Sequence, residues 1–269
     1  MSADAAWQER CAALRARLAA FDALAVAFSG GVDSSVLAHA AREALGPRAV
    51  AVIADSSSLA RRELDSARTT AAAIGIELVE LATRELDDEG YRANAGQRCY
   101  HCKRALFDAM HAWAAARGVR DLAFGEIADD LLDERPGRRA AREARVHAPL
   151  AECGFTKADV RRYAREHALP VAEKPAAPCL ASRLPVGTRV TPERLARVEQ
   201  AEAALAELGL TILRVRDHGP RARVEVGESE LEYARAHELE VARRLRAAGF
   251  QGFELVAYAA PTLRLGALP

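Results

Sequence analysis

The sequence predicts an α/β protein with a doubly wound parallel sheet, followed by a smaller C-terminal α+β domain. Short apolar runs at 24–28 and 49–54 have the length of buried strands, and two further short strands are expected at 77–81 and 121–124. Segments with helical apolar spacing separate these strands. Strands that alternate with helices build a parallel sheet covered on both faces. Five prolines between residues 170 and 192 then interrupt regular structure, so we expect a domain boundary there.

We expect one domain over residues 1–178 and a second over residues 179–269. The helices expected in the first domain lie at about 3–20, 33–45, 59–73, 100–117 and 156–169, the last with Thr156 as its cap. The second domain is expected to contain a helix from Thr191 to about 208, strands at 211–216 and 221–226, one or two helices at 228–248 and a strand at 253–258.

The composition is that of a soluble globular protein, with 50% apolar and 28% charged residues. Basic and acidic residues balance at 38 each, which argues against a large nucleic-acid footprint. No apolar run approaches the roughly 20 residues needed to span a bilayer, and charges interrupt the N-terminal segment, so we expect a cytoplasmic protein without a membrane partner. Only Lys103, Lys157 and Lys174 are lysines among the 38 basic residues, so an isolated arginine carries little information.

A glycine-containing loop follows the first predicted strand. Ser29, Gly30 and Gly31 interrupt the apolar pattern, and a helix opened by Val32, Asp33, Ser34 and Ser35 comes next. Adjacent glycines let backbone amides approach a ligand, and the helix N-terminus adds free N–H groups that suit an anion. The alternative is an ordinary strand–turn–helix junction.

Two further loops are expected beside this one, because ligands of parallel sheets bind at the carboxyl ends of the strands. Asp55 and Gly125 stand at two such ends. Gly125 opens an acidic loop that includes Asp129, which could equally be a solvated charged loop.

Three of the five cysteines have a suggestive spacing: Cys99 and Cys102 form a Cys-x-x-Cys pair, and Cys179 lies in the proline-rich stretch. Three such cysteines could bind an iron–sulfur cluster that leaves one iron open for another ligand. The alternatives are a redox dithiol, part of a zinc site, or thiols with no common function. Cys11 and Cys153 are expected to be inert core thiols.

Ser-Gly-Gly-Val-Asp-Ser at 29–34 resembles the pyrophosphate loop of the PP-loop ATP pyrophosphatases, whose fold is that of the adenine nucleotide α-hydrolases. Further stretches resemble successive signatures of the LarE-type sulfur transferases of nickel-pincer nucleotide biosynthesis. They are Arg98–Lys103, Ala128–Asp130 with Asp133–Gly137, Lys174–Arg183, and Arg214–Gly219. The resemblance covers residues 20–258.

The resemblance implies an enzyme that uses ATP and Mg²⁺ to adenylate the carboxylates of pyridinium-3,5-dicarboxylate mononucleotide, releasing pyrophosphate. Sulfur then replaces AMP, giving thiocarboxylates. In one branch the cysteine matching Cys179 gives up its own sulfur. In the other, cysteines matching Cys99, Cys102 and Cys179 hold a [4Fe-4S] cluster that carries an extra sulfide. Because all three cysteines are present, we favour the cluster branch. The family also implies a homo-oligomer.

The second domain is expected to bind the substrate, because arginines recognise phosphates and carboxylates with two parallel hydrogen bonds. Arg214 and Arg216 share a strand face, and Arg223 lies on the predicted neighbour. Ser182 and Arg183 follow Cys179 closely. The alternative is that these strand arginines merely face solvent. Glu225 is expected either to contact a metal or the substrate or to be a surface carboxylate.

One departure from the family concerns the loop after the fourth predicted strand, where Gly125-Glu126-Ile127 stands in place of Gly-Thr-Asn.

Other functions also remain open: a PP-loop tRNA thiolase, an amidating synthetase that has no use for Cys179, or a non-catalytic nucleotide-binding module. The neutral charge disfavours the tRNA enzyme.

Overall fold

The computed structural model describes residues 3–132 and 136–259. It divides into two compact units, residues 1–178 and 179–269, each with its own hydrophobic core. The predicted Asp133, Glu134 and Arg135 lie outside the described residues. Within the described ranges, no helix is both long and apolar enough to cross a bilayer.

The first unit is built on the predicted parallel sheet, which is confirmed. Its strands are β1 (Leu24–Ala27), β2 (Ala49–Asp55), β3 (Glu77–Ala82) and β4 (Asp121–Phe124), in the order β3-β2-β1-β4. All neighbours run parallel, with Leu24 in register with Ala49 on one side and Asp121 on the other. The chain crosses from β3 to β4 past β1, so the carboxyl ends of β1 and β4 form the switch point where ligands bind.

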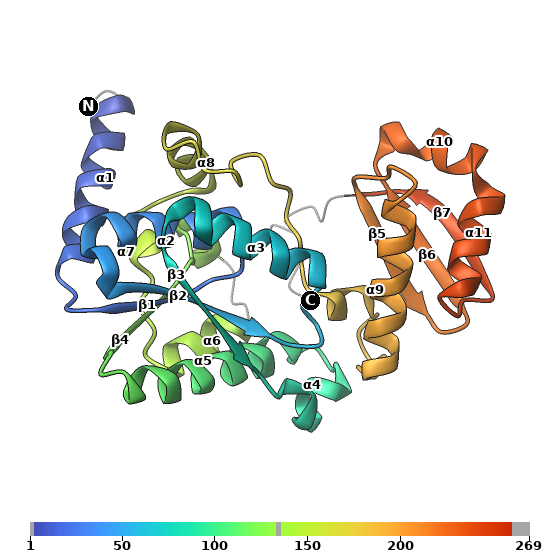
Figure 1. Cartoon of the computed structure of the whole chain (residues 1–269), viewed down its shortest axis with the longest axis horizontal. Coiled ribbons are helices and arrows are strands. Elements are labelled where there is room, and N and C mark those ends of the chain that lie inside the picture. Colours follow the sequence, from blue (N-terminus) through green and yellow to red (C-terminus); the bar gives the residue numbers. More distant parts are fainter. Residues whose placement is uncertain (1–2, 133–135, 260–269) are drawn as a thin grey trace. The chain divides into compact units, whose positions relative to one another are not determined.

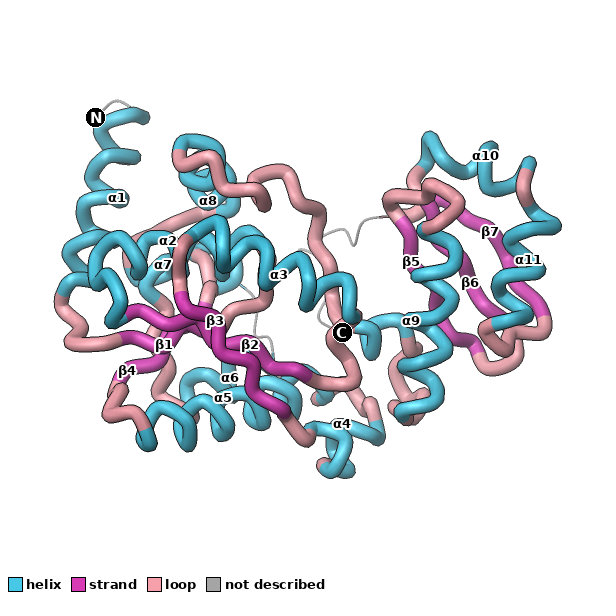
Figure 2. Tube along the Cα trace, in the orientation of Figure 1, coloured by secondary structure: helices cyan, strands magenta, loops and turns pink. Residues whose placement is uncertain are grey.

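Helices cover both faces of this sheet (Figures 1 and 2). Successive side chains of β1 alternate between two cores: Leu24 and Val26 belong to one, Ala25 and Ala27 to the other. The longer helices are α1 (Ala3–Ala19), α2 (Val32–Leu45), α3 (Arg61–Ile74), α5 (Arg98–Ala116) and α8 (Lys157–Glu166). The shorter ones are α4 (Glu89–Ala93), α6 (Pro136–Glu143) and α7 (Pro149–Glu152).

Two features of this unit differ from the sequence prediction. A helix was expected from about residue 100, but α5 begins at Arg98 and therefore includes both Cys99 and Cys102 in its first turns. The acidic loop was expected to continue to Arg138, but α6 begins at Pro136. The eight residues of α6 bury only Ala140 and Ala141, so their pattern is too polar to predict a helix.

The second unit is a three-stranded sheet with helices. Antiparallel strands β5 (Leu213–His218) and β6 (Arg221–Val226) are followed by β7 (Gly252–Ala257), which pairs with β6 in parallel. Helices α9 (Pro192–Ala206), α10 (Leu231–Ala236) and α11 (Glu238–Ala247) complete it. Val215, Val224 and Leu205 lie in its core.

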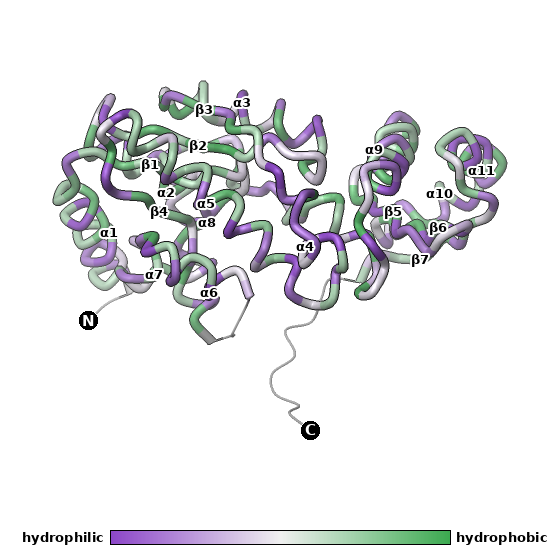
Figure 3. The backbone as a smooth tube through the Cα atoms, turned by 90° about the horizontal axis from the view of Figure 1, so that it is seen from below, coloured by the Kyte–Doolittle hydropathy of each residue, from purple (hydrophilic) through white to green (hydrophobic). Residues whose placement is uncertain are grey.

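Figure 3 shows the contrast in the first unit between the hydrophobic strands β1 and β2 and the helices around them, whose residues are of mixed hydropathy.

Candidate active site

The loop between β1 and α2 has the geometry of an anion site. Gly30 has φ +67°, and a Cβ at this position would lie 2.9 Å from the Cβ of Ala67. Gly31 occupies the N-cap position of α2, where no side chain caps the helix. The first-turn N–H groups of α2 therefore remain available, at the positive end of the helix dipole.

Two serines hold this loop from within. The Ser34 hydroxyl donates to the Gly31 carbonyl at 3.1 Å and accepts from the Ser29 backbone N–H at 3.1 Å, while the two hydroxyl oxygens lie 3.0 Å apart. Val32 and Ser35 are buried. Neither of them lines the adjoining pocket, whereas four other predicted loop residues do: Ser29, Gly31, Asp33 and Ser34.

A lysine that the sequence did not single out for the site connects two predicted nucleotide-site carboxylates. The Asp33 carboxylate accepts from the Lys157 ammonium at 2.8 and 2.9 Å. The Asp129 carboxylate accepts from the backbone N–H of Lys157 at 2.6 Å. Asp33 and Asp129 therefore lie at one edge of the loop, where two carboxylates could approach a cation bound to phosphates.

The end of β4 packs tightly against the same loop. A Cβ at Gly125 would lie 2.8 Å from the Ser34 nitrogen, so no larger residue fits without moving the start of α2. Glu126, one of the two residues that depart from the family pattern, is buried and accepts from Arg138 at 2.7 Å. This ion pair joins the end of β4 to α6.

A pocket of about 470 Å³ opens beside the loop at the carboxyl ends of β1 and β4. Its polar or reactive wall residues include Ser29, Asp33, Cys99, Lys103, Glu126 and Arg138. Phe28, Leu106 and Phe124 form an apolar side. The loop amides, a thiol and a cation therefore share one cavity.

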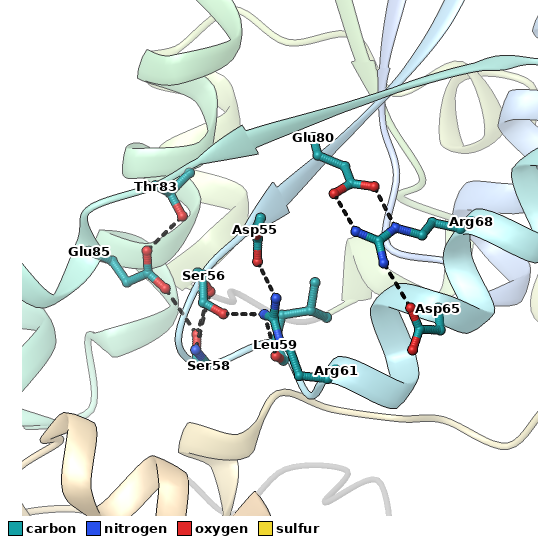
Figure 4. Close-up of polar contacts among 10 residues, drawn as sticks. All are labelled: Asp55, Ser56, Ser58, Leu59, Arg61, Asp65, Arg68, Glu80, Thr83 and Glu85. Atoms are coloured by element: carbon teal, nitrogen blue, oxygen red, sulfur yellow. Dashed lines mark hydrogen bonds and ion pairs between the residues drawn. The ribbon is translucent and has the colours of Figure 1, made fainter.

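Asp55 is the last residue of β2 and is not among the residues that line this pocket. Figure 4 shows its contacts. Its carboxylate pairs with Arg61 at 2.6 Å, and Arg61 also donates to the carbonyls of Ser56 and Leu59. Glu85, a buried residue, accepts from Ser58 at 3.0 Å and thereby fixes the same loop. The sequence offered no signal for Glu85, which stands in a run of charged residues.

The cysteine pair lies on one face of α5, with Cys99 exposed and Cys102 partly buried. Between them, the His101 ring donates from Nδ1 to the Asp88 carboxylate at 2.8 Å and packs on Gly90. Among the described residues, no three His, Cys, Asp or Glu side chains are grouped closely enough to hold a metal ion. Cys11 and Cys153 are partly buried against the core of the first unit, and burial raises the pKa of both thiols.

Cys179 begins the second unit, immediately before a 3₁₀ turn, Leu180–Arg183. Arg183 was expected to hold a substrate anion, but its side chain is buried and pairs with Glu202 at 2.8 Å. Glu202 also accepts from the Val215 backbone at 3.0 Å, and Arg183 donates to the Cys179 carbonyl at 3.3 Å. Arg183 therefore anchors the cysteine-bearing turn to β5, which corrects the expectation.

Two of the three predicted arginines of β5 and β6 pair with the same carboxylate. Arg216 and Arg223 are cross-strand partners, and both pair with Glu225, at 2.6 and 3.6 Å. Arg214 donates to the Tyr258 hydroxyl at 2.6 Å. Arg216 also contacts the Ser182 carbonyl at 3.4 Å. Glu225 is thus a buried counter-ion and not a surface carboxylate, a role that the sequence left open.

Comparison with known proteins gives matches over most of the chain. An uncharacterized protein of Synechocystis sp. is 41% identical over 81% of this chain and 82% of its own length. A pyridinium-3,5-bisthiocarboxylic acid mononucleotide synthase of Lactiplantibacillus plantarum is 33% identical over 89% of this chain and 87% of its own length. The chain belongs to this LarE family.

The family assignment confirms the resemblance and the fold class that the sequence predicted. The asparagine synthase family model matches residues 11–95, from α1 through α4, which includes the glycine loop. An uncharacterized protein of Methanocaldococcus jannaschii is 28% identical over 59% of the chain and 62% of its own length. As a LarE family member, the protein is an ATP-dependent sulfur transferase.

Proposed function

We propose that this protein adenylates the carboxylates of pyridinium-3,5-dicarboxylate mononucleotide and replaces AMP with sulfur, giving the thiocarboxylates of a nickel-pincer cofactor. The observation that carries the proposal is the pocket in which the glycine loop faces Cys99 and Lys103. This pocket occurs in a chain that is similar over 89% of its length to a synthase named for the bisthiocarboxylic product.

The loop side of the pocket suits the first half-reaction. A carboxylate oxygen attacks the α-phosphorus of ATP, the bond to the β-phosphate oxygen breaks, and pyrophosphate leaves with the electron pair. The N–H groups of the loop and the first turn of α2 stabilise the negative charge on the phosphate oxygens. Mg²⁺ bound to the phosphates would neutralise further charge, with the carboxylates of Asp33 and Asp129 nearby.

The arginine face of the second unit suits the acceptor. Arg214, Arg216 and Arg223 present guanidinium groups, and Glu225 orients two of them. Planar guanidinium groups bind phosphate and carboxylate with paired hydrogen bonds. We assign to this face, together with Ser182, the recognition of the mononucleotide.

Sulfur enters when a sulfur nucleophile attacks the acyl carbon and AMP departs. Thiolates and sulfides are strong nucleophiles at neutral pH, which suits this step. Cys99 and Cys102 offer two thiols on one face of α5, of the kind that binds iron, and by the family resemblance Cys179 would be the third ligand. We favour a [4Fe-4S] cluster on these cysteines, which would supply a bound sulfide; the alternative is the sulfur of Cys179 itself.

Pyrophosphate release tests the activation step. Purified protein with ATP and Mg²⁺ should release pyrophosphate when the dicarboxylate mononucleotide is present and little without it. Nicotinic acid mononucleotide, which has one carboxylate fewer, is the matched control for acceptor specificity. Well-folded protein that releases no pyrophosphate under any of these conditions would contradict the proposal.

The sulfur source is tested separately by intact mass and metal content. With the cluster, anaerobic reconstitution should bind iron and sulfide, Cys99→Ser should abolish both, and the mass of the polypeptide should not change after turnover. If the polypeptide instead loses the elements of H₂S, Cys179 is the donor and the cluster proposal is wrong.

A further inference from the structure

The three lysines of this chain all lie at the candidate nucleotide site. The other 35 of the 38 basic residues are arginines. Lys103 lines the pocket, Lys157 pairs with Asp33, and Lys174 reaches the carbonyl of Gly30. In a chain that uses arginine almost everywhere else, positions that keep lysine are those where a guanidinium would not serve.

Lys174 has a coordination that fits an ammonium group. Its Nζ lies 3.1 Å from the Gly30 carbonyl, 2.8 Å from the Ser66 hydroxyl and 2.9 Å from the Glu63 carboxylate. Lysine has three N–H donors around one nitrogen, so three acceptors satisfy it fully. The planar fork of arginine is longer and directs its donors in one plane, so it cannot reach these three acceptors from the same position.

The contact with Gly30 controls the orientation of a peptide group. In a trans peptide the carbonyl and the following N–H point in opposite directions, so anchoring the Gly30 oxygen also sets the direction of the Gly31 N–H. Gly31 lines the pocket. Within the loop, the Gly31 N–H makes one long contact, with the Ser29 hydroxyl at 3.4 Å. Because both residues are glycine, this peptide could otherwise rotate at little cost, so the shorter contact of Lys174 with the Gly30 carbonyl is its main anchor.

The surroundings of Lys174 indicate that its ammonium group holds the loop and does not bind phosphate directly. Glu63 neutralises the ammonium charge, and both side chains are about one-fifth exposed. A lysine whose donors are occupied by protein acceptors acts through those acceptors. The structure therefore offers Lys174 as a support for the loop, placed between the loop and α3.

We propose that Lys174 is a positioning residue: it fixes the Gly30–Gly31 peptide so that the loop N–H groups face the ATP phosphates. This inference deepens the proposed function and rests on it. The lysine ammonium acts through the backbone carbonyl, and arginine cannot replace it. Loss of the contact weakens ATP binding before it weakens the fold.

The test compares Lys174→Arg and Lys174→Met with wild type. Two readouts are used: the KM for ATP in pyrophosphate release, and binding of the non-hydrolysable α,β-methylene ATP by calorimetry. Both variants should bind about tenfold more weakly, which corresponds to one lost hydrogen bond. Lys174→Arg should be no better than Lys174→Met.

Arg161→Ala is the matched control, because Arg161 donates to the carbonyls of Ala172 and Lys174 without touching the loop. It should lower the thermal midpoint while the KM for ATP stays at the wild-type value. Wild-type affinity in Lys174→Arg would overturn the inference. If wild type binds the ATP analogue but releases no pyrophosphate, the proposed function fails while the binding comparison still decides the role of Lys174.

Discussion

At the scale of single residues, the glycine loop depends on the lack of a Cβ atom at Gly30. Gly30 and Gly75 share a left-handed backbone, with φ +67° and +73°, but only Gly30 is enclosed: its Cβ would meet Ala67, whereas that of Gly75 would meet nothing within 4 Å. The comparison of these two glycines separates backbone strain from crowding of the ATP loop.

We therefore predict that Gly30→Ala reduces ATP-dependent pyrophosphate release about a hundredfold, because a displacement near 1 Å disturbs the phosphate geometry. Gly75→Ala carries the same backbone penalty of about 1 kcal/mol and should leave the rate unchanged. Initial rates and thermal midpoints of both variants check this. Equal rates for the two variants would show that crowding at Gly30 is irrelevant.

The Arg183–Glu202 pair is the most deeply buried ion pair at a predicted site residue, with side chains 5% and 2% exposed. Removing one partner leaves an uncompensated buried charge. We predict that Arg183→Met lowers the free energy of unfolding by roughly 3–5 kcal/mol, and that Arg183→Met with Glu202→Leu recovers much of this loss. Urea denaturation followed by circular dichroism measures both. A loss below roughly 1 kcal/mol for Arg183→Met would contradict the assigned role.

The roles of single residues could be predicted only in part from the sequence. The role of the loop glycines was predictable, because their backbone requirement has a local signature in Ser-Gly-Gly. The role of Arg183 was not predictable, because an arginine next to a reactive cysteine has the same sequence pattern whether it binds substrate or pairs with Glu202. The partner lies 19 residues away, and only the folded chain shows it.

At the scale of elements, the start of α8 is held by a capping box. The Thr156 side chain accepts from the Asp159 backbone, and the Asp159 carboxylate accepts from the Thr156 N–H and hydroxyl. Arg10 of α1 also donates to Asp159 at 2.8 Å. Burial alone would raise the pKa of Asp159, but these hydrogen bonds and Arg10 hold it below its usual value.

A lowered carboxylate pKa stabilises the fold above the unfolded pKa, near 4, and the contribution disappears as the pH falls through the folded value. Asp159→Asn should therefore cost about 1 kcal/mol at pH 7, with a difference from wild type that shrinks below about pH 4. Denaturant titrations at pH 7 and in acid give this difference. A cost that stays constant with pH would exclude the carboxylate charge as its source.

Elements with strong periodicity were predictable, and short polar ones were not. The four strands of the first unit lie where they were predicted. The central strands β1 and β2 gave the clearest signal because they are buried on both faces, whereas β3 is an edge strand that is only partly buried. The start of α5 was placed too late, since Arg98–Lys103 faces a pocket and lacks an apolar stripe. Helix α6 was missed because its sequence is polar and only two of its residues are buried, of which Ala141 joins the core beneath the sheet.

At the scale of the whole molecule, two separate cores imply two folding units with different responses to nucleotide. Both tryptophans, Trp7 and Trp113, lie in the first unit, so their fluorescence reports on that unit alone. ATP with Mg²⁺ at about 100 times its Kd should stabilise this unit by about 2.7 kcal/mol.

The expected result is a shift of the tryptophan-detected denaturation midpoint with ATP, while circular dichroism shows a second transition that ATP does not move. A single transition that shifts equally by both probes would mean that the two units unfold together. ADP, which lacks the γ-phosphate, serves as the ligand control.

The boundary of the second unit was suggested by prolines, which disrupt helices and strands on physical grounds. The chemistry was not predictable from composition. It came from the combined signatures around Cys99, Asp129, Cys179 and Arg214, and similarity along 89% of the chain supports the same family. The contacts of Lys174, Glu202 and Glu225 required coordinates, because each depends on residues far away in the sequence.

Mass spectrometry of the acceptor tests the central claim most directly. Pyridinium-3,5-dicarboxylate mononucleotide, incubated with sulfur-loaded protein, ATP and Mg²⁺, should gain the mass of one and then two oxygen-to-sulfur exchanges, and neither product should form without ATP. An acceptor that accumulates only as its adenylate, or that is amidated or unchanged while ATP is consumed, would contradict the account.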